Sequence, residues 1–413
     1  MKILNLSTYD YGGAGSAVLR INEVLISLNH TSKVIVFNKK SEDQNVIQLT
    51  DGNFILFLKK IYRKVYHELQ KTLAFKFVEK YNFFNYSEES IYVNPKLILN
   101  KLDYIPEVII VHYTSHFINF KTIYELQQLI KARIIFNMLD TAFLTGGCHY
   151  SWNCIGYHNK CSDCSALLIQ KDMSIKNHSF KSYYLNKMYS IKLVASSSWA
   201  INQAKKSSLF KNFEKKLIYY PIDQNIFKPK KFNSSNTKKN IFFGTQDFKI
   251  LGKGVIYFEK ALEELAVILQ KNQINNIEIR IVGGGKSKLK IPSNFNANYL
   301  GKLPMAKLIN EYSKADVFVC SSIEDNGPMM INEALMCGSP VVCFDVGIGP
   351  DLVNNSTGYL AQNFSYKDLA KGIYKVLFDS DLEKLKNESR NTAINKYGNK
   401  IVINSWERLI NNI

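Results

Sequence analysis

Short apolar runs alternate with longer segments in which apolar residues recur every three or four positions. The short runs predict buried strands, and the longer segments predict amphipathic helices. In the first half of the chain the predicted strands are 2–6, 33–37, 108–111, 133–136, 193–195 and 217–219, and the clearest helices are 17–28 and 123–130. Alternating strands and helices are typical of an α/β fold built on a parallel sheet.

A second alternation follows a polar, basic stretch at 228–240 that is rich in Lys, Ser and Asn. Its predicted strands are 241–243, 277–282, 298–300, 317–319 and 341–344, and its helices are 255–269, 305–313 and 330–336. We therefore expect two doubly wound parallel-sheet domains, 1–220 and 221–395, facing each other across a cleft. Ligands in such sheets bind beyond the carboxyl ends of the strands, so the loops at these ends are the candidate sites.

Charge is the unusual feature of the composition. The 413 residues are 46% hydrophobic, which suits two globular domains, but the net charge is +18. Residues 1–250 hold 34 basic and 18 acidic side chains, whereas the remainder holds 19 and 17. A one-sided positive charge favours nucleic acid, an anionic membrane surface or a phosphorylated ligand as partner, while the plain alternative is a solubilising surface.

The chain start and the cysteine count narrow the class of protein. The start lacks a basic segment followed by a long apolar one, and no uncharged apolar run approaches the roughly 20 residues that a membrane-spanning helix needs. Seven cysteines argue against a fully paired disulfide framework. The sequence therefore predicts a cytoplasmic protein.

The most informative stretch is 321–342, where a strand ends in an acidic loop and a helix follows. Asp325 lies in the loop, and Glu333 lies on the helix eight positions later. Backbone N–H groups at a helix start suit a diphosphate. A carboxylate such as that of Glu333 can accept hydrogen bonds from both hydroxyls of a ribose.

This string resembles glycosyltransferase family 4, a group of retaining enzymes with the GT-B fold. The resemblance implies that Glu333 holds the nucleotide ribose, that Asp325 acts in catalysis, and that the loop with Gly327, Pro328 and Met329 faces the donor sugar and its diphosphate. It further implies that residues 396–413 cross back onto the first domain.

Other parts of the second domain resemble the same family. Gly283 lies in a glycine-rich turn after a strand, and Lys253 matches the lysine that grips the donor diphosphate. The arginine expected nearby is missing, because Thr245 and Gln246 stand near its place. A lysine cannot reproduce the bidentate contact of a guanidinium, so this departure affects the phosphate contacts.

In the first domain, Gly13 and Gly15 open a helix after the first strand and are expected to face the donor diphosphate. His112 ends the strand 108–111; the resemblance places it beside donor sugar or acceptor, and the alternative is a packed strand-end histidine. Asp140 precedes the string Thr-Gly-Gly-Cys-His-Tyr, which resembles a family 4 subgroup that makes capsules, exopolysaccharides or O-antigens. Asp140 is expected to bind an acceptor hydroxyl.

Four cysteines lie within seventeen residues, at Cys148, Cys154, Cys161 and Cys164. This clustering predicts a closed, structural zinc site, in which a histidine, His149 or His158, is a possible substitute for one thiolate. Two disulfides and four reduced thiols are the alternatives.

The segment 54–80 combines lysines with apolar residues at helical spacing. This pattern suits a helix that lies on an anionic membrane surface or, alternatively, a helix with a solvated basic face.

Together these features predict a GT-B glycosyltransferase that moves a sugar from a nucleotide-sugar to a hydroxyl of a glycan, which we expect to be lipid-linked. No metal is needed for this chemistry, since Lys253 and helix N-termini would neutralise the leaving diphosphate. We expect a cytoplasmic protein peripheral to the inner face of the plasma membrane, with no nucleic-acid partner. The alternatives are a nucleotide-sugar epimerase of similar fold and a non-catalytic nucleic-acid-binding protein.

Overall fold

The computed structural model describes residues 1–50, 61, 65, 78–83, 87–230, 238–274, 276–285 and 288–412. It divides into two compact units, which are described separately. Unit 1 comprises Met1–Ser196, Ala200–Ile218 and Ile403–Ile413, and unit 2 comprises Ser197–Trp199 and Tyr219–Val402. The functional boundaries expected from the sequence, 1–220, 221–395 and 396–413, stay a prediction.

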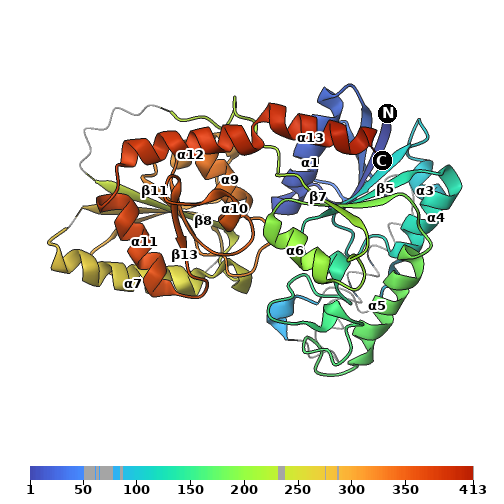
Figure 1. Cartoon of the computed structure of the whole chain (residues 1–413), viewed down its shortest axis with the longest axis horizontal. Coiled ribbons are helices and arrows are strands. Elements are labelled where there is room, and N and C mark those ends of the chain that lie inside the picture. The colour runs from blue at the N-terminus through green and yellow to red at the C-terminus, as the bar shows by residue number, and fades with distance from the viewer. Residues whose placement is uncertain are drawn as a thin grey trace. The chain divides into compact units, whose positions relative to one another are not determined.

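Unit 1 is built on a seven-stranded parallel sheet with the order β3-β2-β1-β4-β5-β6-β7. Strands β5 and β7 of this sheet are labelled in Figure 1. Its strands are β1 (Lys2–Tyr9), β2 (Thr31–Asn38), β3 (Val46–Gln48), β4 (Val108–Val111), β5 (Arg133–Met138), β6 (Ile191–Ala195) and β7 (Glu214–Leu217). Its helices are α1 (Gly12–Ser27), α3 (Pro95–Leu99), α4 (Phe120–Ile130), α5 (Asp172–Leu185), most of α6 (Ser198–Lys206) and most of α13 (Asn399–Asn411). Short 3-10 helices lie at Glu79–Tyr81, Glu89–Ile91, Ala142–Leu144 and Gly156–His158.

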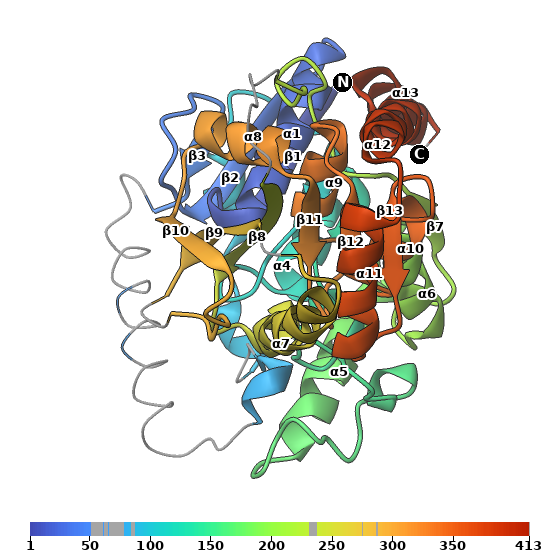
Figure 2. The same ribbon diagram turned by 90° about the vertical axis from the view of Figure 1, so that its left-hand side faces the viewer.

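Unit 2 holds a six-stranded parallel sheet with the order β10-β9-β8-β11-β12-β13, and Figure 2 shows these strands in this order from left to right. The strands are β8 (Lys239–Asp247), β9 (Ile277–Gly284), β10 (Asn296–Gly301), β11 (Val317–Cys320), β12 (Val341–Phe344) and β13 (Gly358–Ala361). The helices are α7 (Val255–Lys271), α8 (Met305–Lys314), α9 (Met329–Met336), α10 (Gly349–Leu352), α11 (Tyr366–Phe378) and α12 (Leu382–Tyr397), and Leu251–Lys253 forms a 3-10 helix. Helices α7 and α11 pack side by side, as do α9 and α12.

In both sheets the strand order reverses beside the first strand of the unit. β1 lies between β2 and β4, and β8 lies between β9 and β11. At such a reversal the connections leave toward opposite faces of the sheet, and a crevice opens at the carboxyl ends of the two strands. The loops after β1 and β4, and those after β8 and β11, are therefore placed to bind ligands.

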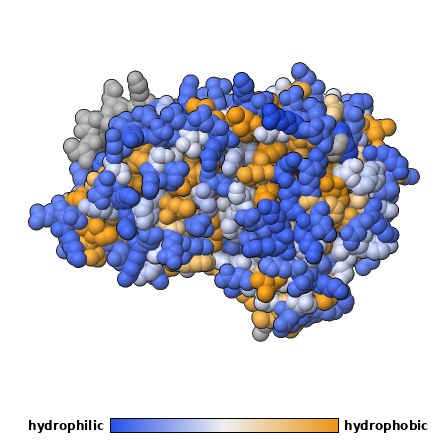
Figure 3. Space-filling view, in the orientation of Figure 1, coloured by the Kyte–Doolittle hydropathy of each residue, from blue (hydrophilic) through white to orange (hydrophobic). Residues whose placement is uncertain are grey.

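Apolar residues of the strands form the core of each unit. All four residues of β4 are fully buried, and so is most of β5, which suits strands with helices on both faces. In unit 2 the rings of Phe243 and Phe258 stack at 3.9 Å, which joins β8 to α7. On the face in Figure 3 hydrophilic residues predominate, and hydrophobic residues form smaller patches among them. Scattered exposed apolar residues are ordinary for a globular surface.

The predicted α/β class and the two parallel sheets are confirmed. The expected strand 217–219 is wrong, because β7 spans Glu214–Leu217, and its side chains are mostly exposed. An edge strand carries charged residues on its open side, so hydrophobic patterning does not detect it. The basic segment 54–80 lies almost entirely outside the described residues. Within the described part of the chain, no helix is both long and apolar enough to cross a membrane.

Gly358 and Gly301 both have a positive φ, but only Gly358 is crowded by neighbouring atoms. Substituting alanine at each position therefore separates the cost of backbone strain from the cost of crowding. Gly358 has φ +146°, and a Cβ there would lie 1.8 Å from the Val341 carbonyl oxygen of the neighbouring strand. Gly301 has φ +65°, and a Cβ there would meet no atom within 4 Å. We expect Gly358→Ala to lower the free energy of unfolding by about 3 kcal/mol or more, and Gly301→Ala by about 1–2 kcal/mol. Urea denaturation followed by circular dichroism measures both, and equal losses would contradict the crowding argument.

Candidate functional site

The carboxyl ends of β8 and β11 are tied together by a short set of polar contacts in unit 2. Lys253 ends the 3-10 helix after β8, and its ammonium contacts Asp325 Oδ2 at 2.5 Å. Asp325 Oδ1 accepts the N–H of Gly327 at 3.1 Å, which shapes the turn before α9. An ammonium has three donors, so Lys253 can hold Asp325 and a phosphate oxygen at once. Both residues predicted to act at the diphosphate thus lie together at the strand-order reversal.

Glu333 lies on α9 and is 5% exposed. Its Oε2 accepts a hydrogen bond from the hydroxyl of Tyr312, a fully buried residue of α8, at 2.9 Å. Pro328 precedes α9 as a buried N-cap residue, and Met329 is the first residue of the helix. A carboxylate has about four acceptor sites, so Glu333 can accept from Tyr312 and also from the hydroxyls of a diol.

The glycine-rich end of β9 is shaped by close packing. A Cβ at Gly283 would lie 2.1 Å from the carbonyl oxygen of Thr245, so glycine lets β9 approach β8. Thr245 itself is 5% exposed, and its Oγ1 has no hydrogen-bond partner among the described residues. Lys302 packs on Gly284, where a Cβ would lie 2.5 Å from its Cε. Lys302, which hydrophobic patterning does not single out, therefore brings a second ammonium to the edge from which the expected arginine is missing.

In unit 1, Gly13 and Gly15 follow β1, and only Gly15 is required by close packing. A Cβ at Gly15 would lie 2.3 Å from the carbonyl carbon of Asp10, so Gly15 lets α1 pack against the end of β1. A Cβ at Gly13 would meet nothing within 4 Å. Packing thus explains Gly15 without a ligand, whereas the backbone at Gly13 is open to a close approach. Their role at the donor diphosphate stays a prediction.

His112 follows β4 and is 1% exposed, with both ring nitrogens bonded to side chains of the same unit. Its Nε2 lies 2.9 Å from Asn5 Oδ1, and its Nδ1 lies 2.9 Å from Asn137 Nδ2. Burial lowers the pKa of His112 to about 3, so the ring is neutral. These bonds join β1, β4 and β5, and they favour the packed strand-end interpretation. Its predicted contact with donor sugar or acceptor stays untested, and a hydrogen bond to either would require one ring nitrogen to exchange its partner.

Asp140 follows β5, and the loop after it brings His149 back to its side. Asp140 Oδ2 lies 2.5 Å from His149 Nδ1, and Tyr113, which follows β4, bonds the other ring nitrogen of His149 at 3.1 Å. His149 and Tyr113 were not expected at this site from their spacing, since His149 was considered only as a metal ligand. The signal that could have found them is the position of all three at the carboxyl ends of adjacent strands.

A buried ammonium anchors the loop that joins Asp140 to His149. Lys181 on α5 is 1% exposed, and its three donors meet Ala142 O at 2.9 Å, Thr145 O at 3.0 Å and Glu88 Oε1 at 3.0 Å. The Glu88 side chain is 4% exposed. A fully buried lysine is rare unless it is paired and hydrogen-bonded, and here every donor has an acceptor. Lys181 therefore holds the loop to α5 and to the segment before α3.

Removing this ammonium should destabilise the protein strongly. In Lys181→Met the Glu88 carboxylate stays buried without its counter-ion, so we expect a loss of about 3–5 kcal/mol in the free energy of unfolding. Adding Glu88→Gln should recover part of that loss. The matched control is Lys176→Met on the same helix, whose pair with Asp172 is largely exposed, so its loss should leave the free energy of unfolding nearly unchanged. Urea denaturation measures all three, and a small loss in Lys181→Met would contradict the anchoring role.

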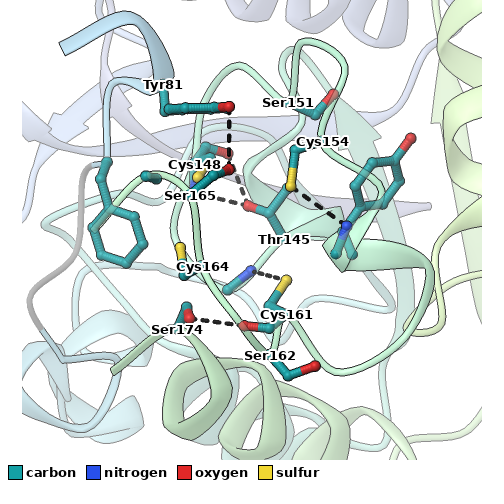
Figure 4. Close-up of a pocket in the computed structure, with 15 residues that line it drawn as sticks. Tyr81, Thr145, Cys148, Ser151, Cys154, Cys161, Ser162, Cys164, Ser165 and Ser174 are labelled. Atoms are coloured by element: carbon teal, nitrogen blue, oxygen red, sulfur yellow. Dashed lines mark hydrogen bonds between the residues drawn. The ribbon is translucent and has the colours of Figure 1, made fainter. Parts of the chain in front are cut away.

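The four clustered cysteines line one small cavity in unit 1 (Figure 4). The cavity measures about 20 Å³, which is room for about one water molecule. Cys161 Sγ accepts the N–H of Gly146 at 3.1 Å, and Cys154 Sγ accepts the N–H of Gly156 at 3.4 Å. The wall is completed by the rings of Tyr81 and Phe83 and by serine and threonine side chains. The cavity is therefore lined by other groups as well as by the four thiols.

The expected zinc site is not supported. All seven cysteines are free thiols, which also excludes the alternative of two disulfides from this structure. Among the described residues, no group of three or more His, Cys, Asp or Glu side chains is placed to hold a metal ion. The physical reason is that sequence spacing brings four thiols to one cavity but does not set the distances between them. Burial also raises the pKa of the Cys148 thiol well above its usual value.

The rate of alkylation should show whether these cysteines are buried, protonated thiols. Burial raises the pKa of Cys161 to about 11, so at pH 8 its thiolate fraction falls roughly 100-fold or more below that of an unfolded cysteine. We expect Cys148 and Cys161 to react with iodoacetamide at least 100-fold more slowly in the native protein than in guanidinium, as measured by site-resolved mass spectrometry. Labelling in chelator at the denatured rate, or one zinc per chain by elemental analysis of reduced protein, would contradict the free-thiol interpretation.

Comparison with known proteins gives one family match. Residues 230–396 match the family model described as glycosyl transferases group 1. The match covers less than half of the chain, and it contains Lys253, Asp325 and Glu333. Unit 2 is thus similar to this family over residues 230–396, and of the residues singled out from the family 4 resemblance, those of the second domain fall inside the match.

Two curated relatives align over 184 residues, or 43% of the chain. The sulfoquinovosyl transferase SQD2 of Arabidopsis thaliana is 25% identical, with 36% of its own length covered. The amylovoran biosynthesis glycosyltransferase AmsD of Erwinia amylovora is 22% identical, with 52% covered. The aligned part of the chain thus spans about a third to a half of each of these relatives.

Solved structures match the whole chain at low identity. A sucrose-phosphate synthase from Thermosynechococcus elongatus has a TM-score of 0.65 at 15% identity, covering 100% of this chain and 98% of its own. Anabaena HepE, solved in complex with UDP-glucose, has a TM-score of 0.63 at 14% identity, with 100% of both chains covered. These likenesses show the GT-B fold, and with the domain match they support a glycosyltransferase enzyme.

Proposed function

We propose that this protein is a retaining glycosyltransferase that moves a sugar from a nucleotide-sugar to a hydroxyl of a glycan. The observation that carries the proposal is the buried carboxylate of Glu333 on α9, inside the domain that matches glycosyl transferases group 1. The bond from Tyr312 holds this carboxylate in place. A ribose diol is the part of a nucleotide that such a preorganised acceptor binds best.

The remaining donor contacts follow from the charges beside Glu333. Lys253, already bonded to Asp325, would hold the diphosphate and stabilise the negative charge that develops on the leaving phosphate. The N–H groups that open α9 after Pro328 would add their partial positive charge, aided by Gly327 and Met329 in the same turn. Asp325 would then face the donor sugar and orient Lys253. The proposal requires no metal in this chemistry.

The acceptor is proposed to bind at the carboxyl ends of the unit 1 strands, where Asp140 would accept the hydrogen of its hydroxyl. The excess of positive charge in residues 1–250 suits an acceptor that carries phosphate, such as a lipid-linked glycan at an anionic membrane surface. AmsD, the relative from Erwinia amylovora, is named for amylovoran biosynthesis. We therefore place the protein in the synthesis of a bacterial surface polysaccharide, at the inner face of the plasma membrane.

Replacing Glu333 tests the donor site. Glu333→Gln keeps the size of the side chain and an acceptor for Tyr312, but it removes the negative charge. We expect the KM for the donor to rise about 10–100-fold, since hydrogen bonds to a charged acceptor contribute more than those to a neutral one. Nucleotide release is measured with UDP-glucose, UDP-galactose, UDP-N-acetylglucosamine and GDP-mannose. An unchanged donor KM in Glu333→Gln would make the ribose assignment wrong.

A matched control separates binding from folding. Glu311 on α8 is a second buried carboxylate of unit 2, and it pairs with Arg280 instead of facing the predicted site. Glu311→Gln should lower thermal stability while leaving the donor KM unchanged. Donor turnover without any sugar acceptor, with formation of an epimeric nucleotide-sugar, would favour the epimerase alternative. No nucleotide release from any donor by the wild-type protein would overturn the proposed function.

A further inference from the structure

Three polar side chains form a linked chain at the carboxyl ends of β4 and β5. Asp140 Oδ2 lies 2.5 Å from His149 Nδ1, and the Tyr113 hydroxyl lies 3.1 Å from His149 Nε2. The rings of Tyr113 and His149 are also nearly parallel, with centroids 5.1 Å apart. His149 is 4% exposed, whereas the Asp140 side chain is 20% exposed. Asp140 is therefore the end of the Asp140–His149 pair that a ligand can reach.

Backbone hydrogen bonds hold both ends of this chain in place. Asp140 Oδ1 accepts the N–H of Ala142 at 2.8 Å. The carbonyl oxygen of His149 accepts both the N–H and the hydroxyl of Thr141, at 3.2 Å and 2.8 Å. The loop closed in this way is also the loop that Lys181 anchors.

Tyr113 is held independently of that loop. Its carbonyl oxygen accepts the N–H of Thr8 at 2.6 Å and the Thr8 hydroxyl at 3.0 Å, which fixes it to the end of β1. Three strands at the order reversal of the sheet thus determine where His149 points. Such support from neighbouring backbone is what a preorganised binding group requires.

The hydrogen-bond pattern sets the tautomer of His149. A carboxylate only accepts hydrogen bonds, so the 2.5 Å contact places the imidazole proton on Nδ1. With that proton on Nδ1, Nε2 can accept from the Tyr113 hydroxyl. Burial, with Asp140 adding to it, raises the pKa of Tyr113 well above its usual value, so this hydroxyl keeps the proton that it donates. The chain of hydrogen bonds thus runs from Tyr113 through His149 and ends at the partly exposed carboxylate of Asp140.

We infer that His149 is a positioning residue for the acceptor: with Tyr113 it aims the Asp140 carboxylate at the sugar hydroxyl that is glycosylated. This inference rests on the proposed function and deepens it on the acceptor side. Two of the four lone-pair sites of Asp140 are taken by His149 and Ala142, which leaves the others for a sugar hydroxyl. Orientation of this kind lowers the cost of bringing the hydroxyl to the donor, and the effect falls on acceptor use.

Two amide substitutions at His149 separate positioning from packing. The amide nitrogen of an asparagine takes the place of Nδ1, so His149→Asn keeps the bond to Asp140. The amide of a glutamine reaches the place of Nε2, where its oxygen can accept from the Tyr113 hydroxyl, so His149→Gln keeps a partner for Tyr113 and loses the bond to Asp140. We expect His149→Asn to retain acceptor kcat/KM within about threefold, and His149→Gln and His149→Ala to lose it about 10–100-fold.

The measurement uses the full chain, the donor found active above, and octyl glycosides of glucose, galactose and N-acetylglucosamine as acceptor probes. Donor KM and hydrolysis of the donor in the absence of acceptor should stay unchanged in all three variants. The control is His178→Asn, which removes a buried histidine of the same unit bonded to Ser208. It should lower thermal stability without changing acceptor KM.

The outcomes are distinct. Equal losses in His149→Asn and His149→Gln, or losses that follow thermal stability, would show that His149 only packs the loop and would overturn the inference. Unchanged acceptor kcat/KM in His149→Gln would overturn it as well. Failure of the wild-type protein to use any donor would instead overturn the proposed function, so the two failures cannot be confused.

Discussion

The reversal of strand order beside β1 and beside β8 is the constraint on which the rest of this structure depends. A parallel sheet sends all of its carboxyl ends to one edge, and the reversal separates the connections on either side of it. In unit 2 that edge collects Lys253, Asp325 and the start of α9. In unit 1 it collects the turn after β1, Tyr113 and Asp140. Residues far apart in the chain therefore meet because of topology, and local sequence does not need to bring them together.

Polar groups in unit 1 are buried in satisfied networks, and this gives the loop after β5 a defined shape. The ammonium of Lys181 has an acceptor for each of its donors, and His112 uses both ring nitrogens between Asn5 and Asn137. In a low-dielectric interior such bonds are strong, and leaving one of these groups unpaired is costly. These networks are structural. They fix the loop that carries His149, so His149 and Asp140 keep their positions at the edge of the sheet.

Prediction from sequence succeeded where the signal is local. The buried strands 108–111 and 341–344 were predicted at their observed bounds, because runs of Val, Ile and Cys between breakers are distinctive. Asp325 and Glu333 were singled out from one string and Lys253 from the segment after the first strand of unit 2, all three through a family resemblance, and their roles stay predictions. The edge strand β7 was misplaced, since it is polar and half-solvated. The zinc site was wrong for a different reason: four thiols in seventeen residues show proximity in sequence, whereas a metal needs distances that only the folded loop sets.

The sequence by itself determined the α/β class and the two parallel sheets, because hydrophobic period is a local property of the chain. Only the tertiary structure decided what the histidines do. Nothing in the sequence shows which partners His112 and His149 have. In the structure His112 is enclosed between Asn5 and Asn137, whereas His149 orients the carboxylate of Asp140. That difference arises because hydrogen-bond partners come from neighbouring strands, and the order of the strands in the sheet is what places them.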